Sequence, residues 1–181
     1  MQAPGRKPQE LSGWWEQMRE GVTARWIVSC RPNAAGMYTR EEISKQKQAF
    51  WTAFGRYMQP VLSAEGEPVS WLNYKTGVAG IHFKMDADRD HAVIMIQLSH
   101  SDTGTRQLQY AQFLSLKSML YGALGEEDWV WKQDSSIHKI ITGVNIHQQM
   151  DWPAIISFLK PRLIALDEFW SMARYSFGAL G

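Results

Sequence analysis

The stretch that decides the fold is VSWLNYKTGVAGIHFKMDADRDHAVIMIQL, residues 69–98. Three short strand patterns follow one another here, over Val69–Lys75, Gly80–Asp86 and His91–Leu98. The second pattern alternates apolar and polar residues, which is typical of a strand with one buried and one solvated face. The third is apolar on both faces, which predicts a place in the middle of a sheet. Because the links between the patterns are short, we expect an antiparallel meander.

Helical patterns flank these strands. An apolar stripe at helical spacing begins at a capping-box pattern around Thr39 and ends at Pro60, and a second helical pattern spans Ser101–Gly125. Two further strands are expected after that helix, over Trp129–Lys132 and Ile137–Ile146.

The last helix is predicted to begin at Asp151 and to end at Gly178. Its apolar residues step by three or four positions straight through Pro161, so we expect one long helix kinked near Lys160 rather than two helices. The predicted element order is α-β-β-β-α-β-β-α. The simplest packing is an α+β fold in which helices pack on a five-stranded, mostly antiparallel sheet.

Residues 1–36 differ from the rest of the chain, because prolines and glycines punctuate them and their tryptophans follow no sustained period. We interpret them as a disordered or spurious N-terminal extension, with a partner-docking arm as the alternative, and residues 37–181 as a single α+β domain. Cys30 is the only cysteine, which excludes an internal disulfide. The sequence shows neither an apolar run long enough to cross a bilayer nor a secretory signal, so we expect a cytoplasmic protein that does not bind membranes.

A helix followed by three strands and a helix also begins the restriction-endonuclease-like core, in which rigidly held carboxylates bind Mg²⁺. That site needs an aspartate on the second strand, and an acidic residue and a lysine one residue apart on the third. The counterparts here are Asp86, Gln97 and Ser99. An amide is a poor Mg²⁺ ligand, and serine carries no positive charge. Asp86, Asp88 and Asp90 are therefore interpreted as turn residues, and a divergent Mg²⁺-dependent nuclease domain with a degenerate site is kept as the alternative.

No other catalytic pattern takes the place of that set, because the sequence contains no nucleophile elbow, no phosphate-binding loop and no helical pair of histidines. The sequence therefore favours a non-enzymatic interaction module without metal or cofactor over an enzyme. From residue 37 onward there are 14 basic and 15 acidic residues, so no general surplus of positive charge indicates nucleic acid.

The expected partner of such a module is a protein or a nucleic acid, and self-association into a homo-oligomer is a further option. The candidate contacts are aromatic and basic residues on the less covered sheet face, where they would be able to stack unpaired bases: Trp71, Lys75, Lys84 and Trp131. The alternative is that this surface is the underside of the core.

Four blocks of the sequence resemble one bacterial family: MYTREEISKQKQAFWTAFGRYMQP (37–60), WLNYKTG (71–77), FKMDAD (83–88) and DWPAIISFLKPRLIALDEFW (151–170). The family is known as domain of unknown function 4268. The resemblance implies an accessory role, since related domains follow nuclease-type modules in some proteins. It implies no catalytic residue, because none is established for the family.

Overall fold

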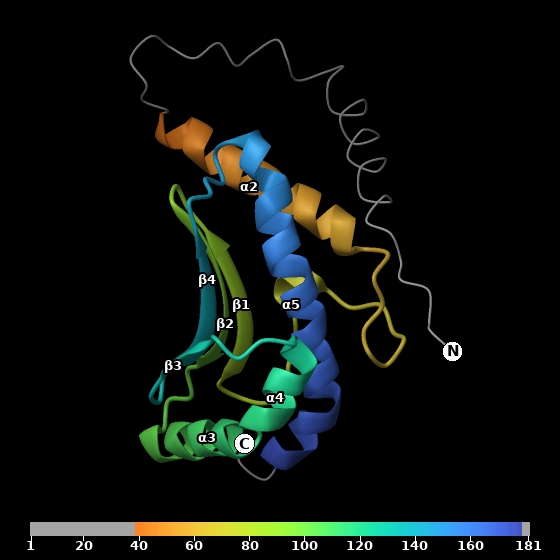
Figure 1. Cartoon of the computed structure of the whole chain (residues 1–181), viewed down its shortest axis with the longest axis vertical. Coiled ribbons are helices and arrows are strands. Elements are labelled where there is room, and N and C mark those ends of the chain that lie inside the picture. Colours follow the sequence, from red (N-terminus) through yellow and green to blue (C-terminus); the bar gives the residue numbers. More distant parts are fainter. Residues whose placement is uncertain (1–38, 179–181) are drawn as a thin grey trace, which may run out of the picture. The chain divides into compact units, whose positions relative to one another are not determined.

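The computed structural model describes residues 39–178. The predicted extension over residues 1–36 lies outside this range. The sheet has four strands in the order β1-β2-β4-β3, and every neighbouring pair is antiparallel. The helices lie on one side of this sheet (Figure 1). The elements are α2 (Arg40–Met58), η2 (Trp71–Asn73), β1 (Ile81–Ala87), β2 (His91–Leu98), α3 (Thr103–Ser115), α4 (Lys117–Leu124), β3 (Val130–Lys132), β4 (Ser136–Thr142), η3 (Gln149–Asp151), α5 (Trp152–Ala173) and η4 (Arg174–Phe177).

The hairpin of β1 and β2 confirms the two strand patterns that follow Gly80. In β1, Ile81 and Phe83 are buried against the helices, whereas His82 and Lys84 are exposed on the other face. The apolar strand β2 pairs with β1 on one side and with β4 on the other, so it occupies an interior position. The prediction that a strand apolar on both faces belongs inside the sheet is therefore confirmed.

The first predicted strand, Val69–Lys75, is wrong, and the sheet consequently has four strands and not five. This segment forms the single turn η2, followed by a loop. The Trp71 indole, which is 3% exposed, donates a hydrogen bond from Nε1 to the carbonyl of Val61 at 2.8 Å. The apolar residues that mimic a strand are thus buried by the packing of a turn, without joining a β-ladder.

The helix predicted over Ser101–Gly125 divides into α3 and α4 at Leu116, whose backbone leaves the helical conformation. Asp102 caps α3 by accepting a hydrogen bond from the backbone N–H of Thr105 at 2.6 Å. Gly125 ends α4 with φ of 68°, as expected for a glycine at this position.

The final helix α5 continues through Pro161 and confirms the prediction of one long helix. It carries much of the core, including Leu159, Leu163 and Trp170, which are each at most 2% exposed. The kink near Lys160 stays a prediction. None of the helices between residues 39 and 178 is both long and apolar enough to span a bilayer.

Candidate functional site

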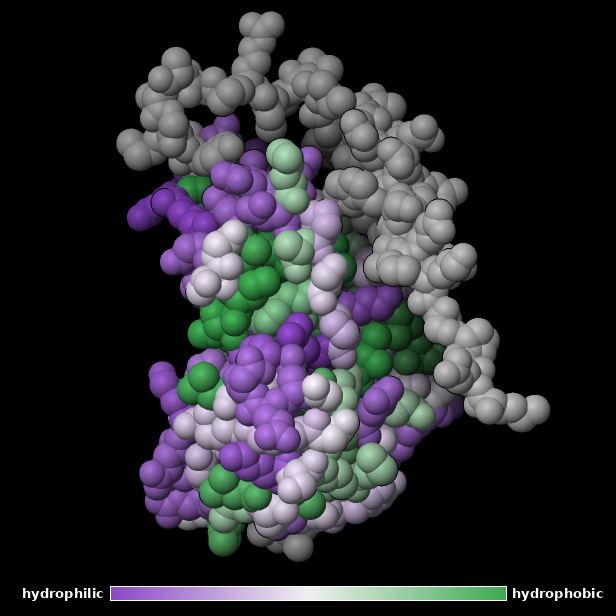
Figure 2. All heavy atoms as spheres, viewed as in Figure 1, coloured by the Kyte–Doolittle hydropathy of each residue, from purple (hydrophilic) through white to green (hydrophobic). Residues whose placement is uncertain are grey.

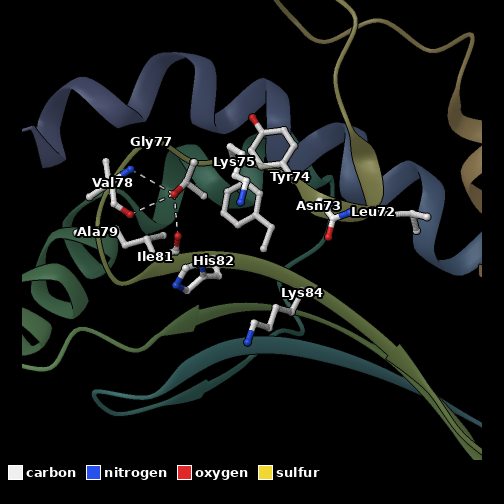
Figure 3. Close-up of a pocket in the computed structure, with 12 residues that line it drawn as sticks. Leu72, Asn73, Tyr74, Lys75, Gly77, Val78, Ala79, Ile81, His82 and Lys84 are labelled. Carbon is white, nitrogen blue, oxygen red and sulfur yellow. Dashed lines mark hydrogen bonds between the residues drawn. The ribbon is translucent and has the colours of Figure 1, made fainter.

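A groove of about 440 Å³ runs between β1 and the loop that precedes it. One wall is formed by loop residues 72–79, and the other by residues 81–84 of β1 (Figure 3). Because β1 is an outer strand, the groove follows a free edge of the sheet.

The charged residues of the groove are basic. Lys75 on the loop and Lys84 on β1 are both exposed, and exposed His82 adds an imidazole ring. In Figure 3, Lys75 lies on the loop side of β1, whereas His82 and Lys84 project toward the opposite side. Of the twelve described residues that line the groove, none carries a carboxylate side chain. The edge of β1 is therefore flanked by positive charge on both sides.

The loop wall is fixed to the core through Thr76. Its hydroxyl donates to the carbonyl of Ile81 at 2.7 Å, and its own carbonyl accepts a hydrogen bond from Nε1 of Trp170 on α5 at 2.8 Å. Gly77 and Gly80, with φ of 77° and 78°, supply the left-handed backbone that lets the loop reverse into β1. The groove is consequently a preformed feature whose wall is anchored to α5.

Tyr74 forms a second anchor of the loop. Its hydroxyl donates to Oδ1 of Asp167 at 2.6 Å, while Oδ2 accepts from the backbone N–H of Ala64 at 2.6 Å. Burial, together with the hydrogen bond to the Asp167 carboxylate, raises the pKa of Tyr74 above its ordinary value. The phenol therefore stays protonated and serves as a hydrogen-bond donor rather than as a general base. Its ring stacks on Phe83 of β1 at 5.2 Å.

The four contacts predicted from the sequence do not form one surface. Lys75 and Lys84 line the same groove. Trp71 lies in the core with its Nε1 engaged, so it presents no ring face to a partner. Trp131 is on β3 at the opposite edge of the sheet, and its half-buried ring faces Tyr110 and Tyr121 at 6.1 and 6.3 Å.

The residues of the nuclease alternative also lie apart. Asp86 is opposite Val93 in the β1–β2 ladder, and Gln97 is opposite His82, four residues along the strand. At about 3.3 Å per residue this separates the two positions by roughly 13 Å. The Asp86 carboxylate instead pairs with Nζ of Lys47 on α2 at 2.7 Å. Within the range 39–178 no three His, Cys, Asp or Glu side chains gather to hold a metal ion.

A carboxylate that the sequence analysis did not identify accepts hydrogen bonds from several elements outside the groove. Glu126, after α4, accepts hydrogen bonds from Nε and Nη2 of Arg162 on α5 at 2.8 Å, from Nζ of Lys139 at 2.7 Å and from Nε1 of Trp129 at 2.9 Å. Burial raises the pKa of Glu126, but these donors outweigh it and hold the pKa below its usual range. Nothing in the local sequence marks Glu126 over its exposed neighbour Glu127, because its two cationic partners, Lys139 and Arg162, lie 13 and 36 residues away.

His147 is the second residue that the sequence did not single out. It is 5% exposed, and neither ring nitrogen has a hydrogen-bond partner among residues 39–178. Its Nε2 lies 3.8 Å from Oδ1 of Asp88. Burial lowers the pKa of this imidazole, and the Arg89 and Lys47 charges add to the effect, although Asp88 opposes it. The neutral form is therefore favoured.

The outer face of the sheet is partly apolar. Hydrophobic residues gather where β4 lies, between two hydrophilic areas (Figure 2). The exposed side chains here include Ile140 on β4 and Val130 on β3, at 47% and 52%.

Comparison with known proteins places the chain by its sequence alone. A search of curated proteins and a search of solved structures each returned no match. A family model matches residues 46–174, which include every helix and strand described above apart from the first residues of α2 and all of η4 beyond Arg174. The chain therefore belongs to the family described as Domain of unknown function (DUF4268).

Proposed function

We propose that this protein is a non-enzymatic interaction module that binds an acidic segment of a protein partner in the groove beside β1. The observation that carries the proposal is the charge of the groove: Lys75 and Lys84 flank it, and no residue between 39 and 178 contributes a carboxylate to its lining. Elsewhere the described surface mixes both signs, since residues 39–178 carry 14 basic and 15 acidic side chains. A local basic site on a near-neutral domain favours recognition of one acidic segment.

A protein partner fits these features better than a nucleic acid does. Stacking of unpaired bases needs aromatic faces that are open to the ligand, and Trp71 is enclosed in the core. A nucleic-acid backbone also demands a surplus of cations along its path, whereas the groove offers two lysines.

The test is a binding titration with a defined probe, in which fluorescence anisotropy reports the bound fraction. The probe is a fluorescein-labelled peptide of about nine residues that alternates glutamate and valine, and its glutamine counterpart is the neutral reference. We expect the acidic peptide alone to bind, and Lys75→Glu with Lys84→Glu to weaken it at least about tenfold. Added salt should weaken binding in the same way.

The matched control is Lys45→Glu with Arg56→Glu, which makes the same change in net charge on exposed positions of α2. This pair should leave the affinity within about twofold if the groove is the site. Equal losses in the two double variants, or no binding by the native chain, would overturn the proposal. A labelled oligothymidylate that binds more tightly than the acidic peptide would replace the protein partner with a nucleic acid.

A further inference from the structure

The edge of β1 presents backbone groups to the groove in a regular pattern. The backbone N–H of Ser99 donates to the Gly80 carbonyl at 2.7 Å, and the N–H of Asp88 donates to the His91 carbonyl at 2.9 Å. In an antiparallel ladder, residues that bond to the partner strand alternate with residues that point away from it. The even-numbered residues of β1 therefore bond to β2, and the odd-numbered residues direct N–H and C=O toward the free edge.

Both ends of this edge are already closed by the protein itself. The N–H of Ile81 donates to the Val78 carbonyl at 3.3 Å, and the Ile81 carbonyl accepts a hydrogen bond from the Thr76 hydroxyl. At the other end, the N–H of Ala87 donates to Oδ1 of Asp86 at 2.9 Å.

Between these ends, Phe83 and Met85 stay open. Their edge-facing N–H and C=O groups have no hydrogen-bond partner within the described part of the chain. A row of unpaired N–H and C=O groups on an edge strand is a template for pairing with another chain.

A second copy of the chain is a poor occupant of this edge. Lys84 stands between Phe83 and Met85, so pairing of two β1 edges around this point would bring two ammonium groups together. A lysine on an edge strand is a known device against self-pairing. An incoming strand with carboxylates beside Lys84 would instead gain from the same charge.

We propose that the groove binds its partner by strand addition: an extended acidic segment of another protein pairs with β1 and satisfies the backbone groups of Phe83 and Met85. The proposal rests on the proposed function and specifies the conformation of the bound segment. Backbone hydrogen bonds supply a part of the affinity that depends little on side chains. Alternate carboxylates of the segment share one face of the added strand, where they meet Lys84. The segment is short, because the open edge is limited to residues 83–85.

The experiment uses the full chain and the alternating glutamate–valine peptide, with a single backbone N-methyl group placed at each position in turn. In strand addition only every second peptide N–H points to β1. Methylation at alternate positions should therefore weaken binding about tenfold or more, whereas methylation at the intervening positions should leave it within about twofold.

A protein variant tests the same edge from the other side. Met85→Pro removes an N–H that faces the edge but none that bonds to β2, and proline is tolerated on edge strands in that orientation. Its melting temperature and circular dichroism establish whether the variant is folded. We expect weaker peptide binding than with Met85→Leu, which keeps the N–H. The methyl scan decides the question by itself if Met85→Pro does not fold.

The outcomes separate the two proposals. Loss at alternate methylated positions supports strand addition. If methylation changes the affinity at no position, but Lys75→Glu with Lys84→Glu abolishes binding, strand addition is overturned and the charged groove remains the proposed site. No binding of the acidic peptide overturns both. A native chain that sediments at twice 20.8 kDa, and at 20.8 kDa as Met85→Pro, would assign the edge to a second copy instead.

Discussion

At the scale of single residues, the close approach of Gly80 to His100 limits what the start of β1 can accept. A Cβ atom at Gly80 would lie 2.5 Å from Cβ of His100 and 2.7 Å from its backbone nitrogen. The backbone of Gly80 is also left-handed, with φ of 78°. An added methyl group therefore meets a steric clash and backbone strain together.

We predict that Gly80→Ala destabilises the fold by clearly more than the strain alone, which is about 1–2 kcal/mol. Gly77→Ala is the matched control, because Gly77 has nearly the same φ but nothing within 4 Å of the added atom. Chemical denaturation of both variants measures the difference. Equal losses of stability would show that the contact with His100 relaxes at no cost.

The sequence alone placed Gly80 at the start of a strand pattern but did not distinguish its role from that of Gly77. Both are followed by small or apolar residues, and nothing local to Gly80 indicates His100, which is twenty residues away. The approach is created when Gly80 and Ser99 pair at the end of the β1–β2 ladder. Such a long-range constraint is set by tertiary structure and leaves no mark on propensity.

At the scale of elements, Glu126 links the segment after α4 to β4 and to α5. Its side chain is 21% exposed, and the side chains of Arg162 and Lys139 are 19% and 15% exposed. Because these cations are partly buried, loss of the shared carboxylate leaves them poorly compensated.

We predict that Glu126→Gln lowers the free energy of unfolding by about 1–3 kcal/mol. For a chain of this size the melting temperature should fall by roughly 2–4 °C per kcal/mol. Glu127→Gln is the matched control, since Glu127 is exposed and adjacent. Equal melting temperatures for the two variants would contradict the structural role proposed for Glu126.

The elements that the sequence predicted well are those whose pattern reflects burial directly. The alternation in β1 and the apolar β2 followed from their positions at the edge and in the interior of the sheet. The segment Val69–Lys75 has the same apolar spacing, but its buried residues pack from a turn whose indole bonds to Val61. Spacing reports which residues are buried, not which backbone groups pair, so the extra strand was wrong.

At the scale of the whole molecule, two histidines make stability depend on pH. Burial lowers the pKa of His147 and also that of His138, to which the Lys132 charge contributes. The unfolded chain binds a proton at each near pH 6.5, whereas the folded chain resists it. Unfolding therefore takes up protons below that pH, and stability falls as the pH drops from about 6.5 toward the folded-state pKa values.

We predict that the melting temperature decreases between about pH 7 and pH 5, before carboxylates begin to titrate. His147→Leu should flatten this slope, because His147 is the more deeply buried of the two histidines. It is 5% exposed, whereas His138 is half-buried. The readout is the slope and not the melting temperature itself, which a core substitution also changes. An unchanged slope in His147→Leu would assign the pH dependence to other groups.

Two of the four residues that the sequence suggested as partner contacts lie in the candidate site. Lys75 and Lys84 were selected as basic residues near the less covered face, and they line one groove. The sequence could not show that Trp71 turns into the core, or that Trp131 belongs to the opposite sheet edge, because both facts depend on strand order. The groove itself arises where Thr76 fastens the loop to Trp170 of α5, 94 residues away.

The alternating orientation of β1 has a consequence for deuterium exchange. The amide hydrogens of His82, Lys84 and Asp86 are held in the ladder with β2, whereas those of Phe83 and Met85 are not. Amide exchange followed by NMR should therefore rise and fall with a period of two residues along a single strand. The amides of Phe83 and Met85 would exchange slowly in the presence of a saturating ligand only if the ligand covers this edge. One labelled sample would therefore show, residue by residue, which part of the edge the ligand occupies.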